Sequence, residues 1–214
     1  MSAQPRVILC YGDSNTWGQI PGSDEGRFSP QVRWTGVLAA QLGPGYQVIE
    51  EGLCGRTTLW DDPIEGYKNG REYLIPCLES HRPIDLVVLM LGTNDLKLRF
   101  SVPAYDIAAS IGVLVEIIQK SATGKANQPP QVLVIAPPPL GILTEYADMF
   151  EGGHAKSKKL TEHYQRVAKE HQCAFLDAGQ EIVSSDLDGV HFDAGQHSRL
   201  GMAVAGKVKE IFTE

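Results

Sequence analysis

The sequence predicts an α/β fold, a three-layer α/β/α sandwich around a five-stranded parallel sheet, and two observations carry this prediction. Short runs rich in β-forming residues alternate along the chain with segments whose apolar residues follow the helical period. In addition, the two longest runs, "DLVVLML" at 85–91 and "QVLVIA" at 131–136, are apolar after their first residue. Continuous apolar runs are typical of central strands that helices cover on both faces.

The expected elements follow in chain order. We expect strands at 6–10, 46–50, 85–91, 131–136 and 173–177, and helices at 32–42, 104–120, 155–171 and 196–212. The segment 104–120 is the clearest helix, because its apolar residues fall on one face: Ile107, Ile111, Leu114, Val115 and Ile118. Asp193 and Gln196 resemble a capping box at the start of the last helix.

Composition favours one globular domain spanning residues 1–214. Hydrophobic residues make up 43% and charged residues 21% of the chain, and no linker rich in Pro, Gly or Ser divides it. The net charge is -7, and the longest basic cluster is "KSKK" at 156–159. Nucleic acid and anionic membranes are therefore poor partners for this surface. The apolar stretch near the N-terminus is too short for a signal peptide or a membrane span, which predicts a cytoplasmic protein.

The four cysteines are Cys10, Cys54, Cys77 and Cys173. They are widely scattered and form no C-x-x-C pair, so the pattern indicates neither a zinc site nor a disulfide framework. Cys54 is expected to be a small packing residue.

Three expected connections are longer than a compact fold needs: 15–31, 51–76 and 137–154. They carry many of the aromatic residues, Trp17 among them. Long loops of this kind usually line a binding site or a contact surface, although simple loop packing explains any single aromatic residue about as well. We expect Trp17 to be a wall of the substrate pocket or a contact between subunits.

Polar motifs follow the predicted strands at the points where they end. In chain order they are "GDS" at 12–14, "EGLCGR" at 51–56, "GTND" at 92–95, "PPP" at 137–139 and, one loop beyond the last strand, "DGVHFD" at 188–193. In open α/β sheets, ligands bind beyond the carboxyl ends of the strands. These motifs therefore predict one shared site.

The residue types in these motifs suit acyl transfer. Ser14 offers a nucleophilic hydroxyl, His191 a general base, and Asp188 a carboxylate that orients the imidazole. The backbone N–H groups of Ser14 and Gly55 and the side-chain amide of Asn94 are expected to stabilise the oxyanion. If His191 is the base, activity should rise with pH as the imidazole becomes neutral. Asp13 and Asp95 are expected to be structural and to bind nearby backbone groups.

These motifs together resemble the SGNH (GDSL-type) hydrolase superfamily, over nearly the whole chain. The four motif residues match as Ser14, Gly55, Asn94 and His191, with Asp188 before the histidine. The segments "VRWTGVLA", "MLGTND", "PPPL" and "FEGG" are similar to the bacterial arylesterase and acyltransferase (perhydrolase) branch.

The resemblance implies a flavodoxin-like fold and ester hydrolysis through a serine acyl-enzyme, without a metal or organic cofactor. It also implies acyl transfer to alcohols, perhydrolysis, and assembly into dimers or higher oligomers. Asn15 stands where leucine is common, and Gly55 where the branch often has alanine. The first departure leaves the nucleophile in place, and the second alters the pocket floor.

Several alternatives stay open at this point. A carbohydrate acetylesterase, a lysophospholipase or a thioesterase would use the same triad as an esterase for short acyl and aryl groups. A metal-dependent phosphoesterase would use another set of ligands: Asp13, Asp95, Asp188, His191 and Asp193. A noncatalytic binding module on the same scaffold is the third class, because a fold alone does not fix a function.

Overall fold

The computed structural model, which describes residues 4–23 and 26–213, contains a five-stranded sheet in the order β2-β1-β3-β4-β5. All neighbouring strands are parallel. The strands are β1 (Arg6–Gly12), β2 (Tyr46–Gly52), β3 (Leu86–Met90), β4 (Gln131–Ala136) and β5 (Ala174–Asp177). The predicted parallel sheet is thus confirmed, and β3 and β4 are interior strands as their apolar runs indicated.

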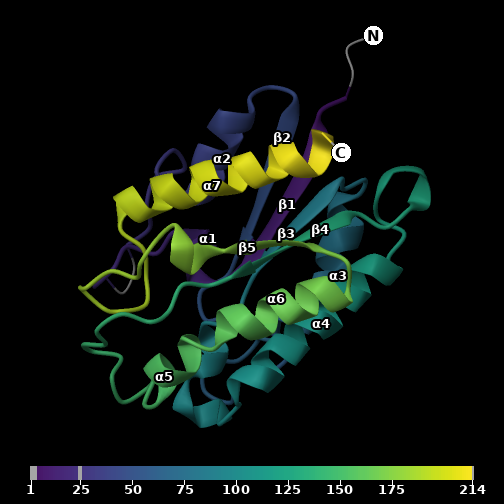
Figure 1. Cartoon of the computed structure of the whole chain (residues 1–214). Coiled ribbons are helices and arrows are strands. Elements are labelled where there is room, and N and C mark those ends of the chain that lie inside the picture. The colour runs from purple at the N-terminus through teal and green to yellow at the C-terminus, as the bar shows by residue number, and fades with distance from the viewer. Residues whose placement is uncertain (1–3, 24–25, 214) are drawn as a thin grey trace.

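Helices cover both faces of the sheet, which gives the predicted three-layer sandwich (Figure 1). On one face lie α2 (Trp34–Leu42) and α7 (Ala194–Thr213), and on the other α3 (Gly70–His81), α4 (Ala104–Lys120) and α6 (Leu160–Glu170). The short helices are α1 (Ser14–Trp17) and α5 (Gly153–Ser157), and 3-10 turns occur at Asn94–Leu96, Leu98–Phe100, Lys125–Asn127 and Ala178–Gln180.

The alternation of side chains along each strand divides the core into two layers. In β1, Ile8 and Cys10 are buried toward α2 and α7, whereas Leu9 and Tyr11 are buried on the opposite face. All four side chains are 0% exposed. The sheet is therefore packed on both sides, and the predicted site motifs lie at or beyond the carboxyl ends of its strands.

The long connection predicted at 51–76 is wrong from residue 70 onward, because α3 begins at Gly70. The Asn69 side chain accepts from the Arg71 N–H and caps this helix, and Leu74, Cys77 and Leu78 face the core. Pro76 lies inside α3. Because proline disfavours helix interiors, this residue explains why the sequence did not predict the helix.

The helix predicted at 155–171 is two helices, α5 and α6. The Ser157 hydroxyl donates to the carbonyl oxygen of His154 at 2.8 Å and accepts from the Leu140 N–H at 3.0 Å. The bond from Ser157 to the His154 carbonyl oxygen engages a backbone acceptor at the end of α5 and so competes with continuation of the helix. The predicted capping box also differs, because the Asp193 carboxylate accepts from Ser185 and the Gln196 side chain from the Val183 N–H.

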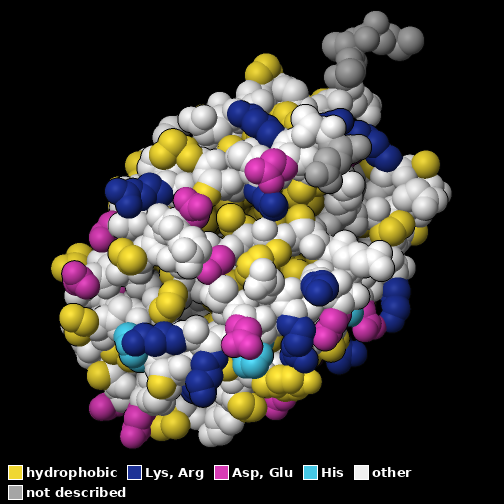
Figure 2. Space-filling view, in the orientation of Figure 1, with side chains coloured by type: hydrophobic (Ala, Val, Ile, Leu, Met, Phe, Trp, Pro, Cys, Tyr) yellow, Lys and Arg dark blue, Asp and Glu magenta, His cyan; other side chains and the backbone are white. Residues whose placement is uncertain are grey.

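The surface carries mixed charge. On the face shown in Figure 2, basic and acidic side chains are interspersed rather than gathered by sign. Within the described part of the chain, no helix is both long and apolar enough to cross a membrane.

Candidate active site

Ser14 is the first residue of α1, directly beyond the carboxyl end of β1. The Asp13 carboxylate accepts from the Asn15 N–H at 3.0 Å and caps this turn. A Cβ atom on Gly12 would lie 2.0 Å from Oγ1 of Thr16, so the tight reversal requires glycine there. The strand, the turn and the cap together fix the Ser14 hydroxyl at the edge of the sheet.

His191 and Asp188 lie in the connection that precedes α7, and the fold brings them to Ser14. Nε2 of His191 lies 3.0 Å from Oγ of Ser14, and its Nδ1 lies 2.8 Å from Oδ2 of Asp188. All three side chains are buried, with Asp188 0% exposed. This hydrogen-bonded chain has the order that activates a serine hydroxyl: nucleophile, base and orienting carboxylate.

Several donors hold the Asp188 carboxylate in its ionised form. Oδ1 accepts from the N–H groups of Val190 and His191 at 2.8 and 2.9 Å, and Oδ2 also accepts from the Gly22 N–H at 3.0 Å. Burial alone would raise the pKa of Asp188, but the hydrogen bonds from His191 and Val190 outweigh it and lower the pKa well below its usual range. Asp188 is therefore a fixed anion facing the imidazole.

Ser14, Gly55, Asn94 and His191 line one cavity of about 140 Å³. Gly55 has a φ of +81°, and Nδ2 of Asn94 donates to the carbonyl oxygen of Arg56 at 3.1 Å. This bond ties the Asn94 amide to the loop that carries Gly55. The cavity is well below the roughly 300–1,000 Å³ of sites for drug-sized ligands, so it suits a small acyl group.

The connections after β2 and β3 together contribute a charged wall that the sequence did not predict. Glu65 and Lys97 both line the cavity, and Lys97 is only 4% exposed. Lys97 forms an ion pair with Glu65, while Arg99 lies 3.0 Å from Asp62 and 3.7 Å from Glu65. A Cβ atom on Gly55 would lie 2.3 Å from Oε2 of Glu65. Glycine at position 55 thus leaves the space that Glu65 occupies.

The third long loop, 137–154, supplies an aromatic and apolar wall through Tyr146, Met149 and Phe150. The Tyr146 ring meets the His191 imidazole edge to face, with 6.1 Å between the ring centroids. Each of the three long connections contributes to the cavity, since Gln19, Cys54 and Glu65 come from the other two.

Asp13 and Asp95 are buried beside the site and bind nearby groups. The Asp95 carboxylate accepts hydrogen bonds from the backbone N–H and the hydroxyl of Thr58. The Asp13 carboxylate accepts one from the backbone N–H of Asn15. Burial raises the pKa of each carboxyl to about 6, and the neighbouring Asp13 contributes to the shift of Asp95. These hydrogen bonds hold neighbouring backbone in place and are separate from the contacts that join Ser14, His191 and Asp188.

Cys54 lines the cavity, but its thiol is held in the neutral form. Sγ donates to Oε1 of Gln19 at 3.3 Å. Burial, followed by the nearby Asp13 carboxylate, raises the pKa of Cys54 to about 11. Because the thiolate is the nucleophilic form, this environment suits packing better than catalysis.

Trp17 follows Ser14 closely in the chain but is not among the residues that line the cavity. Its half-buried ring lies beneath the Arg27 guanidinium, 4.6 Å from the ring centroid, and Nε of Arg27 donates to the Trp17 carbonyl oxygen. A role for Trp17 in substrate binding stays a prediction.

The ligand set expected for a metal-dependent phosphoesterase does not converge. The group of three His, Cys, Asp or Glu residues that does converge within the described residues lies elsewhere, at Glu51, Cys77 and His81. Asp188 and His191 instead bind one another.

The chain matches the model of the GDSL-like lipase/acylhydrolase family over residues 10–199. A search of curated proteins finds no match. Among solved structures, it is similar to the native aryl esterase of M. smegmatis, with 45% identity, a TM-score of 0.92, and coverage of 96% of this chain and 99% of that chain.

A second similar structure is Est24, a carbohydrate acetylesterase from Sinorhizobium meliloti, with 45% identity, a TM-score of 0.93, and the same coverage of 96% and 99%. The lipase/acylhydrolase from Enterococcus faecalis shares the fold at 21% identity and a TM-score of 0.66, with 96% of each chain covered. The resemblance to SGNH hydrolases expected from the motifs is confirmed.

Proposed function

Because the chain belongs to the GDSL-like lipase/acylhydrolase family and is an ester hydrolase, we propose that Ser14, His191 and Asp188 form its catalytic triad. The observation that carries the proposal is the chain of contacts from Ser14 Oγ to His191 Nε2 at 3.0 Å and from His191 Nδ1 to Asp188 at 2.8 Å. The proposed substrates are small or short-chain acyl esters, aryl esters included.

In the proposed reaction, His191 removes the Ser14 proton as Oγ attacks the ester carbonyl carbon. The resulting oxyanion accepts hydrogen bonds from the Ser14 and Gly55 N–H groups and from the Asn94 amide. His191, now an imidazolium facing the Asp188 anion, gives its proton to the leaving alkoxide. Water then attacks the acyl-enzyme and His191 accepts a proton from it. As the second tetrahedral intermediate collapses, the bond between the carbonyl carbon and Oγ breaks and His191 returns the proton to Oγ, which gives free Ser14 and the carboxylic acid.

The small cavity supports a short acyl group. Its volume of about 140 Å³, with Tyr146, Met149 and Phe150 on one side, suits a short acyl group better than a long one. The proposal is tested with aryl esters of acetate, butyrate and octanoate. We expect kcat/KM to fall as the acyl chain lengthens, and a preference for octanoate would favour a lysophospholipase or thioesterase instead.

Acyl transfer and perhydrolysis extend the same proposal. An alcohol or hydrogen peroxide would replace water as the acceptor for the acyl group on Ser14, and the apolar wall would disfavour water. Adding a primary alcohol to the hydrolysis assay should then give a new ester at the expense of the acid. If the acid alone forms at every alcohol concentration, the transfer activity is absent.

A carbohydrate acetylesterase is the second candidate function, and the charged wall favours it. Glu65 lines the cavity with its side chain 32% exposed, and a carboxylate accepts hydrogen bonds from sugar hydroxyl groups. An acetylated sugar and an aryl acetate should be compared at equal concentration, in the wild type and in Glu65→Gln. A selective loss of activity on the sugar ester would support this candidate.

Four further expectations accompany the proposal. We propose a single domain over residues 1–214, a homo-oligomer, and a cytoplasmic location. We also propose that Trp17 acts as a pocket wall or a subunit contact, because it adjoins Ser14 in sequence and is half-buried. If Trp17→Ala changes neither acyl preference nor the oligomeric mass in solution, this role of Trp17 is wrong.

A further inference from the structure

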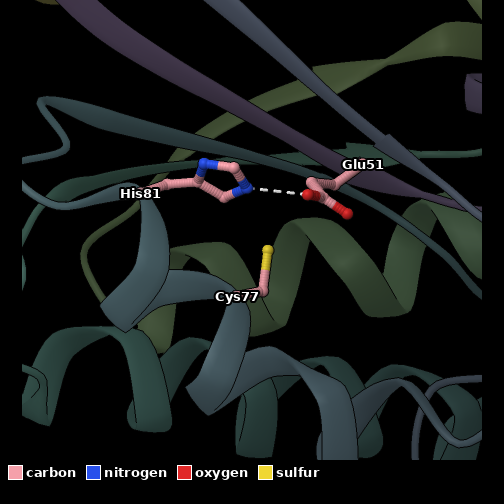
Figure 3. Close-up of side chains that lie close together, drawn as sticks. All are labelled: Glu51, Cys77 and His81. Carbon is pink, nitrogen blue, oxygen red and sulfur yellow. Dashed lines mark hydrogen bonds and ion pairs between the residues drawn. The ribbon is translucent and has the colours of Figure 1, made fainter.

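A second cluster of reactive side chains, Glu51, Cys77 and His81, lies apart from the Ser14 cavity. Their donor atoms, one carboxylate oxygen, one thiol sulfur and one ring nitrogen, all lie within 4.8 Å of one another. Figure 3 shows the Cys77 sulfur pointing from α3 toward the space beside the His81 imidazole and the Glu51 carboxylate. None of the three belongs to the proposed catalytic machinery.

Local geometry explains why the three side chains converge. Cys77 and His81 are four residues apart on α3, so their side chains lie on the same face of successive helical turns. Glu51 belongs to β2, where side chains alternate between the two faces of the sheet. Its neighbour Glu50 forms an ion pair with Arg33 beside α2, which leaves Glu51 facing α3 on the other side.

The donor set is one that Zn²⁺ favours. Zinc binds thiolate at about 2.3 Å and imidazole or carboxylate at about 2.0–2.2 Å, usually with four ligands in a tetrahedron. Nε2 of His81 lies 2.7 Å from Oε1 of Glu51, so an ion between them would replace this hydrogen bond. A thiolate and a carboxylate would together balance the two positive charges of the ion.

The surroundings give an ion a route and a place for a fourth ligand. Glu51 lines a surface cavity of about 510 Å³ with Arg56 and Tyr73, and the His81 side chain is 28% exposed. Solvent therefore reaches the Glu51 and His81 side chains, while Cys77 is buried. Burial, followed by the nearby Glu51 carboxylate, raises the pKa of the Cys77 thiol to about 12, and the Arg56 guanidinium, which lies 4.1 Å from the Tyr11 ring centroid, only opposes this shift. A bound ion would therefore have to displace the thiol proton, as a coordinating metal ion does.

We propose that Glu51, Cys77 and His81 bind one Zn²⁺ ion or a similar borderline-soft divalent cation, with water as the fourth ligand. The bound ion links the C-terminal turn of α3 to β2 and stabilises the packing of this helix on the sheet. The sequence reading missed the cluster because Glu51 is distant in the chain and α3 was taken in part as a loop. The proposal does not depend on the proposed esterase function.

The test uses the untagged full chain and Co²⁺ as a spectroscopic substitute for Zn²⁺. We expect one equivalent of Co²⁺ to bind with a thiolate-to-cobalt charge-transfer band in the near ultraviolet, and Zn²⁺ to displace it. The band should vanish in Cys77→Ser and persist in the controls Cys54→Ser and Cys173→Ser, whose thiols are half-buried elsewhere.

His81→Gln is the second variant, because the His81 side chain is partly exposed and its replacement leaves the core intact. Far-ultraviolet circular dichroism checks the fold of both variants. Loss of this one ligand should weaken Zn²⁺ binding at least about tenfold. It should also remove the rise in melting temperature that Zn²⁺ gives the wild type. His163→Gln on α6 is the matched control and should bind as the wild type does. Absence of the charge-transfer band in the wild type, or equal Zn²⁺ affinity in His81→Gln, would overturn the proposal.

Discussion

The Ser14 hydroxyl oxygen lies 3.0 Å from Nε2 of His191, although the two residues are 177 positions apart in the chain. Ser14 follows β1, which is an inner strand of the sheet, and His191 lies just before α7, which packs on that sheet. The fold therefore brings an early and a late part of the chain together at this contact. The proposed mechanism rests on this contact.

Replacing Asp188 by Asn should lower kcat by about 10³–10⁴ while KM changes little. The amide keeps the shape of the side chain, but it removes the charge that orients His191 and stabilises its cation. The measurement is steady-state hydrolysis of an aryl acetate. Asp186→Asn, an exposed aspartate two positions away, is the control and should retain wild-type activity.

Asn94→Ala should lower kcat by about 10²–10³, because it removes one proposed donor to the oxyanion. The effect should fall on kcat rather than KM, since negative charge develops on the carbonyl oxygen only in the transition state. Full kinetic curves distinguish the two. An increase in KM with kcat unchanged would place Asn94 in ground-state binding instead.

Gly55→Ala should destabilise the fold by more than Gly66→Ala. Both glycines have positive φ, but a Cβ at Gly66 meets no atom within 4 Å, whereas one at Gly55 lies 2.3 Å from the Glu65 carboxylate. Gly66→Ala therefore measures the backbone cost alone, about 1–2 kcal/mol. Urea unfolding supplies the values.

The contact between Gly55 and Glu65 is isolated by a double-mutant cycle. Glu65→Ala removes the carboxylate that the new methyl group would meet, so the double variant should lose less stability than the sum of the single variants. Additive losses would show that the Glu65 side chain moves aside without cost.

The difference in free energy of unfolding between the wild type and the Asp95→Asn variant should depend on pH. Burial raises the pKa of Asp95 to about 6 from its ordinary value of 3.8, so the folded state binds more protons than the unfolded state between these values. Ionisation of Asp95 thus lowers the free energy of unfolding as pH rises from about 4 to 6, by up to about 1.4 kcal/mol per pH unit.

Asn mimics the protonated carboxyl, so Asp95→Asn should gain stability over the wild type across the same window. Comparing the two proteins cancels the opposite contribution of His197, whose pKa burial lowers to about 4, because both contain it. The measurement is urea unfolding at pH 4, 5, 6 and 7. If the difference in free energy of unfolding between the two proteins stays constant across this range, the raised pKa of Asp95 is contradicted.

The sheet and its central strands were predictable from sequence, because continuous apolar runs such as 131–136 are typical of strands buried on both faces. The helix α3 was not, since Pro76 interrupts its pattern and its stability comes from burying Leu74 and Leu78 against the core. Tertiary packing of this kind overrides local propensity.

The proposed catalytic residues could be found because Ser14 follows a strand end and Asp188 and His191 lie one loop beyond the last strand, positions that the parallel topology brings to the same edge of the sheet. Glu65 and Lys97 could not, because their place in the cavity depends on the path of the 53–69 connection and on ion pairs with Asp62 and Arg99. No local pattern encodes a contact between a loop carboxylate and Gly55.

The most direct test of the central claim is intact mass spectrometry after treatment with a fluorophosphonate, which reacts with activated serine hydroxyls. The account predicts one adduct on the wild type and none on Ser14→Ala, with Ser110→Ala labelled as the wild type because the buried Ser110 hydroxyl donates to the Asp106 carbonyl oxygen on α4. No adduct on the folded wild type, or equal labelling of Ser14→Ala, would contradict the assignment of Ser14 as the nucleophile.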